Sequence, residues 1–139
     1  MELNIERLSH DDAERLQKHR DWMVGHYEDP SGYESVTGKL RLISTILENG
    51  WVETDETWKL HSLGVTFGDA LEQEIDSLHW AVVEDEYGRD PALQWRDTTT
   101  VVFPLTAIAK RVEDHAEVDV EKIFVGFQKA IAEAVRGAT

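Results

Sequence analysis

The stretch from Leu60 to Pro104 most constrains what this chain can fold into, because its apolar period changes from that of a helix to that of a strand. Apolar residues first recur every three or four positions, at Leu60, Leu63, Phe67, Leu71 and Ile75. Gly64 and Gly68 lie one turn apart beside this apolar face. Because glycine inside a helix costs about 1 kcal/mol relative to alanine, the pair predicts close packing by another helix or the sheet. Approach of a ligand is the alternative.

The second half of this stretch predicts three short strands. After Ser77 the period becomes two, with Trp80 and Val82 on the face opposite Ala81 and Val83. Turn-forming residues follow at 84–89, then a second strand over 93–96 and a third over 99–103. The connections are too short for parallel crossovers, so we expect a three-stranded antiparallel β-meander.

Helices are predicted on both sides of the meander. Ser9 is a candidate N-cap for a first helix, and Ser31 with Glu34 forms a capping-box pattern for a second that ends at Asn49-Gly50. Thr54 or Asp55 would cap the helix that carries the two glycines. Two further helices begin at Pro104 and after Asp119. The expected fold is α+β and one domain over 1–139. A helical hairpin (1–53) extends a helix–meander–helix core (54–139), with the two C-terminal helices packed on the sheet.

The middle of the chain resembles a bacterial family catalogued as domain of unknown function 3806. The resemblance rests on an LGxxFGxxL segment, a tryptophan-containing strand, a glycine turn and the segment FPLTAIAKRVE before an acid-capped helix. The matching residues are Leu63, Gly64, Phe67, Gly68, Leu71, Trp80, Gly88, Pro104, Lys110, Arg111 and Asp119, within a range of roughly 58–128. The family has no established activity, so the resemblance implies a fold and not a mechanism.

Composition excludes several classes of protein. The formal net charge of −14 opposes binding to nucleic acid and to anionic membranes. The absence of cysteine excludes disulfides and thiolate zinc sites. The chain has no apolar run near the ~20 residues that span a bilayer, and its start lacks the pattern of a signal peptide. We therefore expect a cytoplasmic protein.

The acidic charge is concentrated between Leu60 and Gly88, a stretch without Lys or Arg. Its candidate binding surface consists of Asp69, Glu72, Asp76, Glu84, Asp85 and Glu86, with Tyr87 as an aromatic anchor. A solvated surface is one interpretation, and a docking surface for a basic protein is the other. We expect a protein–protein interaction module, for example an immunity-type or inhibitor protein, that is a monomer or a weak homodimer.

The second hypothesis is a small-ligand or metal-binding module. Its pocket would lie between the glycine-bearing helix and the sheet, lined by Trp58, Gly64, Gly68, Trp80 and Trp95. Calcium binding at 84–86 is a weaker variant, because this segment lacks the spacing of an EF-hand loop. His19 and His26 are seven residues apart and would need a third ligand such as Glu28 or Asp29 to hold a metal.

Signatures of catalysis are missing from the sequence. It contains no P-loop, Rossmann fingerprint, GxSxG motif or cysteine nucleophile. His61 and His79 have no nucleophile paired with them in the sequence. We therefore expect no enzymatic activity, no catalytic residues, no resident metal and no cofactor.

Overall fold

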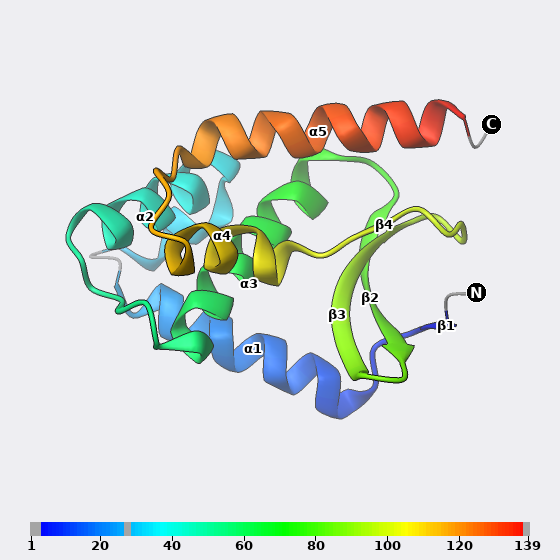
Figure 1. Ribbon diagram of the computed structural model, residues 1–139, viewed down its shortest axis with the longest axis horizontal. Coiled ribbons are helices and arrows are strands. Elements are labelled where there is room, and N and C mark those ends of the chain that lie inside the picture. The colour runs from blue at the N-terminus through cyan, green and yellow to red at the C-terminus, as the bar shows by residue number, and fades with distance from the viewer. Residues whose placement is uncertain (1–3, 27–28, 138–139) are drawn as a thin grey trace.

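The structure is a computed structural model and describes residues 4–26 and 29–137. Its fold is α+β, with five α-helices and one antiparallel sheet in the described part of the chain (Figure 1). The elements in order are β1 (Asn4–Glu6), α1 (His10–Val24), the 3₁₀ helix η1 (Pro30–Glu34), α2 (Val36–Glu48), α3 (Thr57–Glu74), β2 (Leu78–Asp85), β3 (Gly88–Trp95), β4 (Val101–Val102), α4 (Pro104–Glu113) and α5 (Val120–Arg136).

The sheet has four strands in the order β1-β2-β3-β4, where three were expected. The added strand is β1, whose Ile5 lies opposite Val83 of β2. Three residues carry too little alternation to predict a strand, so β1 depends on pairing with a distant partner. The β2–β3 hairpin is longer and tighter than expected, since its pairing continues to Asp85 and Gly88. Gly88 has a φ of 133°, which suits the turn.

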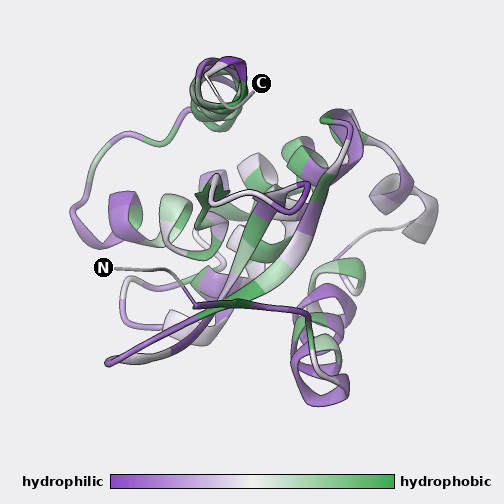
Figure 2. Ribbon diagram, turned by 90° about the vertical axis from the view of Figure 1, so that its right-hand side faces the viewer, coloured by the Kyte–Doolittle hydropathy of each residue, from purple (hydrophilic) through white to green (hydrophobic). Residues whose placement is uncertain are grey.

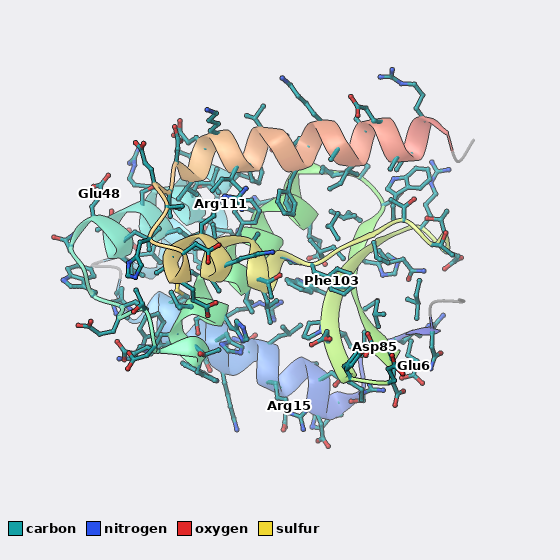
Figure 3. The ribbon with its side chains drawn as sticks, in the orientation of Figure 1. Glu6, Arg15, Glu48, Asp85, Phe103 and Arg111 are labelled. Atoms are coloured by element: carbon teal, nitrogen blue, oxygen red, sulfur yellow. The ribbon has the colours of Figure 1, made fainter. Side chains whose placement is uncertain are left out.

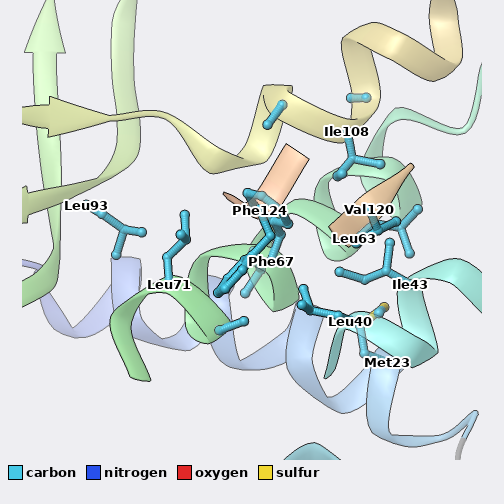
Figure 4. Close-up of a cluster of buried hydrophobic side chains, with 14 of the residues drawn as sticks. Met23, Leu40, Ile43, Leu63, Phe67, Leu71, Leu93, Ile108, Val120 and Phe124 are labelled. Carbon is cyan, nitrogen blue, oxygen red and sulfur yellow. The ribbon is translucent and has the colours of Figure 1, made fainter. Parts of the chain in front are cut away.

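Helix α3 is the centre of the molecule and packs against α1, α2 and α4. The predicted apolar face is its buried side, since Leu60, Leu63, Phe67 and Leu71 have no exposed surface. Figure 4 shows Leu63, Phe67 and Leu71 in one cluster with Met23, Ile43, Ile108 and Phe124, which come from four other helices. The core therefore joins the N-terminal helical hairpin to the rest of the chain.

The two glycines of α3 lie where other elements approach closely. A Cβ at Gly64 would come within 2.7 and 2.8 Å of the carbonyl oxygens of Leu105 and Pro104 at the start of α4. A Cβ at Gly68 would lie 2.5 Å from the Trp80 ring. The predicted close packing by a helix and by the sheet is therefore present at these positions.

The helix starts agree with the sequence in part. Ser9 and Asp12 form a reciprocal capping box on α1, and Asp119 caps α5. The capping box predicted at Ser31 is wrong, because Ser31 lies in η1 and Ser35 caps α2. The prediction of Thr54 or Asp55 as the cap of α3 is also wrong. That helix begins at Thr57, after Glu56, without a side-chain cap.

Helix α5 lies on the outside of the molecule, joined to α4 by an extended connection (Figure 2). It packs against α2 and α3, and its Phe124 and Phe127 meet the ring of Phe67 edge-on at 5.7 and 5.2 Å. Helix α4 packs against α3 and β3. In the described part of the chain, no helix has both the length and the apolar character that crossing a membrane requires.

Candidate functional site

Four aromatic side chains form a connected, partly exposed surface at the C-terminal end of α1 and the N-terminal end of α3. Trp22 comes from α1, His26 from the turn that follows it, Trp51 from the α2–α3 connection, and Trp58 from α3. Ring centroids lie 5.9 Å apart for Trp51–His26, 4.4 Å for His26–Trp22 and 6.3 Å for Trp22–Trp58. Trp51 and Trp58 remain 48% and 47% exposed. We call these four residues the aromatic surface, and exposed tryptophans grouped in this way are typical of binding sites.

Buried polar contacts hold the aromatic surface from behind. His19 stacks on Trp58 with 4.5 Å between ring centroids, and its Nδ1 lies 2.7 Å from the Ser62 hydroxyl. Burial, together with the charges of His61 and Arg20, lowers the pKa of His19 to about 4. The ring is therefore neutral near pH 7, and Trp58 rests on a fixed partner.

The contact between His19 and Ser62 does not prepare a nucleophile. The Ser62 hydroxyl donates its proton to the Trp58 carbonyl oxygen at 3.1 Å. It must then accept the hydrogen bond from His19 Nδ1–H, which places no basic nitrogen against the serine. The second histidine, His26, has its Nδ1 2.9 Å from the Trp22 carbonyl oxygen. Both imidazoles are thus packed in the aromatic surface or directly behind it. Of the suggested third ligands, Glu28 lies outside the described residues.

Acidic residues lie beside the aromatic surface in the sequence. The α2–α3 connection that carries Trp51 also carries Glu53 and Asp55, both exposed. Glu56, at the end of this connection, accepts a hydrogen bond from the Glu53 amide at 2.8 Å and pairs with Lys59 at 2.5 Å. The sequence did not predict this surface, because Trp22 lies 29 positions before Trp51 and 36 positions before Trp58.

Asp69, which was expected on an exposed acidic face, is a buried acceptor of hydrogen bonds. Arg20 donates to its two oxygens at 2.7 and 2.9 Å. Tyr33 Oη donates at 2.5 Å and Trp80 Nε1 at 2.9 Å. Each carboxylate oxygen therefore accepts two hydrogen bonds, and only 8% of the residue is exposed. These contacts join α1, η1 and β2 to α3.

The charges around Asp69 perturb its neighbours. Burial and the negative charge of Asp69 raise the pKa of Tyr33. Burial alone would lower the pKa of Arg20, but the hydrogen bond and charge of Asp69 raise it. Burial also lowers the pKa of Lys39, whose Nζ donates to Gln73 Oε1 at 2.6 Å. The stretch between Leu60 and Gly88 contains no Lys or Arg, but Arg20 of α1 and Lys39 of α2 contact it in the fold.

The other predicted acidic residues are divided between two places. Glu72 accepts a hydrogen bond from the Trp80 amide at 3.3 Å, and burial raises its pKa. Asp76 is exposed beyond the end of α3. Glu84, Asp85 and Glu86 lie with Tyr87 at the tip of the β2–β3 hairpin, where Tyr87 is 88% exposed. The structure therefore does not gather the six acids on one surface.

The hairpin tip is partly neutralised by a cation. Arg89 pairs with Glu6, with Asp12 at 2.8 Å and with Glu84 at 3.4 Å. Figure 3 shows Glu6 and Asp85 at the same end of the molecule. The side chain of Asp85 accepts a hydrogen bond from the Tyr87 amide at 2.8 Å. Glu86 and Tyr87 are both exposed at this tip.

The structure does not bring the five residues of the hypothesised pocket around one space. Gly64 faces α4, while Gly68 is covered by Trp80 and Pro104. Trp58 lies 11 positions before Asp69, or about 16 Å along α3, and contacts His19 instead. Trp95 is buried, with the Arg96 guanidinium 4.3 Å from its ring. In the described residues no cluster of His, Asp and Glu could hold a metal ion.

Comparisons with known proteins agree with the fold. A crystal structure from Bacteroides thetaiotaomicron VPI-5482 superposes with a TM-score of 0.74 at 13% sequence identity. The alignment covers 94% of this chain and 48% of the other, so this chain spans about half the length of that protein. No curated protein matches the chain. Residues 39–124 match the family described as Domain of unknown function (DUF3806), a range that begins within α2, before the 58–128 expected from the sequence. Because this match spans more than half of the chain, the protein belongs to the DUF3806 family.

Proposed function

We propose that this protein is a protein-binding module for a basic partner, as an immunity-type or inhibitor protein would be. The observation that supports this proposal is the aromatic surface, where Trp51 and Trp58 are half exposed in a molecule whose other apolar side chains mostly pack inside. Tryptophans are enriched among the residues that contribute most to binding between proteins. Their rings also attract the guanidinium and ammonium groups of a basic partner.

Charge supports the choice of a basic partner. The net charge of −14 attracts cationic proteins and speeds their association. Glu53 and Asp55 are exposed on the connection that carries Trp51, so they add negative charge near the aromatic surface that would attract a bound Arg or Lys. The hairpin tip with Glu86 and Tyr87 is the second place where the same partner could bind. We propose the cytoplasm as the compartment, consistent with the absence of cysteine.

The experiment captures partners on the immobilised protein at low and high salt, with three baits compared. The first bait is unchanged, the second carries Trp51→Ser and Trp58→Ser, and the third carries Glu86→Lys and Tyr87→Ser. We expect a basic protein that is captured at low salt, weakened by high salt and lost with the second bait. A captured protein is then purified and titrated by calorimetry, where the second variant should bind at least about tenfold more weakly.

The third bait decides between the two surfaces. Asp85 is left unchanged there, because its side chain supports the turn. Loss of the partner with the third bait alone would assign binding to the hairpin tip and not to the aromatic surface. A partner that is not basic, or whose binding does not respond to salt, would contradict the proposed function. A generic basic protein of similar charge serves as the control for non-specific attraction.

A further inference from the structure

A groove of about 700 Å³ lies between α5, β4 and the end of α4, away from the aromatic surface. Its apolar wall is formed by Val102 of β4 and by residues on one face of α5. Those residues are Ile123, Gly126, Phe127 and Ala130. Volumes of this size are typical of sites for small molecules, and such sites are mostly apolar with a few polar groups.

Gly126 is the residue that packing within the chain does not explain. Gly38, Gly64 and Gly68 are the other glycines within the described α-helices, and a Cβ on any of them would lie less than 3 Å from neighbouring atoms. A Cβ on Gly126 would have no such neighbour within 4 Å. Glycine inside a helix costs about 1 kcal/mol relative to alanine. At Gly126 the absence of a side chain leaves the wall of the groove open, at this cost in helix stability.

Charged groups line the same groove at the start of α5. Arg111, at the end of α4, and Lys122 bring two cations, and neither forms an ion pair within residues 4–26 and 29–137. Figure 3 shows Arg111 in the region between α4 and α5. Of the two acids there, Asp119 accepts a hydrogen bond from the Lys122 amide as the cap of α5, and Glu117 is exposed. The N-terminal end of α5 adds the positive end of its dipole.

We propose that this groove binds an amphipathic small molecule whose apolar chain lies along Gly126 and whose anionic head group meets Arg111 and Lys122. A medium-chain carboxylate has this chemistry. Its carboxylate would form charge-assisted hydrogen bonds with the two cations, and its chain would leave water for the apolar wall.

A second copy of the chain fits the groove less well. Two molecules of net charge −14 repel each other, which opposes self-association at low salt. A helix from another copy is also about 10 Å wide with its side chains, and the groove is bounded by three elements of the same chain. This site is separate from the aromatic surface and does not depend on the proposed function.

The test titrates decanoate into the folded protein below the concentration at which it forms micelles. Calorimetry measures the affinity, and ¹H–¹⁵N spectra locate the binding. We expect saturable binding with shifts at residues of α5 and β4. Decanol should bind more weakly, because its head group carries no charge. Decyltrimethylammonium should bind most weakly, because Arg111 and Lys122 repel its cationic head group.

Two variants test the site itself. Gly126→Leu fills the groove, and it also has higher helix propensity, so the protein should fold and yet bind decanoate about tenfold or more weakly. Ala132→Leu adds a similar side chain at an exposed position of α5 that does not line the groove, and it should bind as the unchanged protein does. Lys122→Gln should weaken decanoate several-fold, about the effect of one charged hydrogen bond, and leave decanol unchanged.

Three results would overturn the proposal. They are no saturable decanoate binding, equal binding of the three head groups, and equal binding by Gly126→Leu and Ala132→Leu. Sedimentation velocity is run on the same samples. A dimer that Gly126→Leu dissociates would assign the groove to a second copy and likewise refute a small-molecule site.

Discussion

Alanine substitutions at three helical glycines should change stability in opposite directions, and Gly64→Ala is the clearest case. The new Cβ would lie 2.7 and 2.8 Å from the carbonyl oxygens of Leu105 and Pro104. These atoms belong to the backbone at the start of α4, so they cannot rotate away. The separations are about 0.5–1 Å too short for normal contact, and α4 must move away from α3. Overpacking of this kind costs about 1–3 kcal/mol, which exceeds the gain of up to about 1 kcal/mol in helix propensity.

Gly68→Ala meets a side chain instead of backbone, and the side chain is held in place. The new Cβ would lie 2.5 Å from the Trp80 ring and 2.9 Å from Pro104 Cγ. Trp80 is buried, and its Nε1 donates to Asp69 at 2.9 Å. Displacing the ring would therefore also strain that hydrogen bond. We expect a loss of stability at least as large as for Gly64→Ala.

Gly126→Ala is the matched control, because no atom outside the adjacent backbone of its own helix lies within 4 Å of the added methyl group. Here helix propensity acts alone, and we expect a gain of up to about 1 kcal/mol. The assay is urea unfolding followed by tryptophan fluorescence and circular dichroism. A changed midpoint with an unchanged slope reports stability. The reasoning is refuted if Gly64→Ala and Gly68→Ala both raise the midpoint as Gly126→Ala does.

Three further predictions follow from the polar contacts. Asp69→Asn leaves Arg20 without its counter-charge and should lower the free energy of unfolding by about 3 kcal/mol. Asp76→Asn, at an exposed position, is the control and should change the free energy of unfolding by less than about 0.5 kcal/mol. Because the pKa of His19 falls to about 4 in the folded protein, the unfolded chain takes up its proton first as pH falls below about 6.5. The unchanged protein should therefore lose stability between those two pH values relative to His19→Gln, and parallel curves would contradict this. Ser9→Ala removes one half of a capping box and should lower stability by about 1 kcal/mol in thermal unfolding.

The elements that the sequence predicted depend on local patterns. The apolar period of α3, the alternation in β2 and the proline at the start of α4 are signals contained within one element, and the structure confirms each. The wrongly predicted cap shows where a local pattern is insufficient. Ser31 and Glu34 have the spacing of a capping box, but a 3₁₀ turn occupies those residues, and α2 starts five residues after Ser31.

The candidate site depends on contacts between distant residues, which a single sequence does not reveal. Asp69 was assigned to an acidic face because no base lies near it in sequence, yet Arg20 reaches it from 49 residues away. Glu84 is likewise paired with Arg89 across the hairpin. The tryptophans of the aromatic surface come from three segments. A count of local charge therefore overestimates free acidity wherever the fold brings bases from other helices.

The buried contacts between α1 and α3 neutralise Asp69 and also support the aromatic surface. Arg20 ties the middle of α1 to α3, and the residue before it, His19, stacks on Trp58, while Trp22 follows two positions later. Helix α1 is thus held on α3 at two places, by an ion pair and by a neutral histidine bonded to Ser62. Side chains that are already fixed lose less conformational entropy when a partner binds. If the aromatic surface binds a partner as we propose, the buried polar groups between α1 and α3 would offset part of the entropic cost of binding. A purely apolar contact between the two helices would orient the rings less precisely.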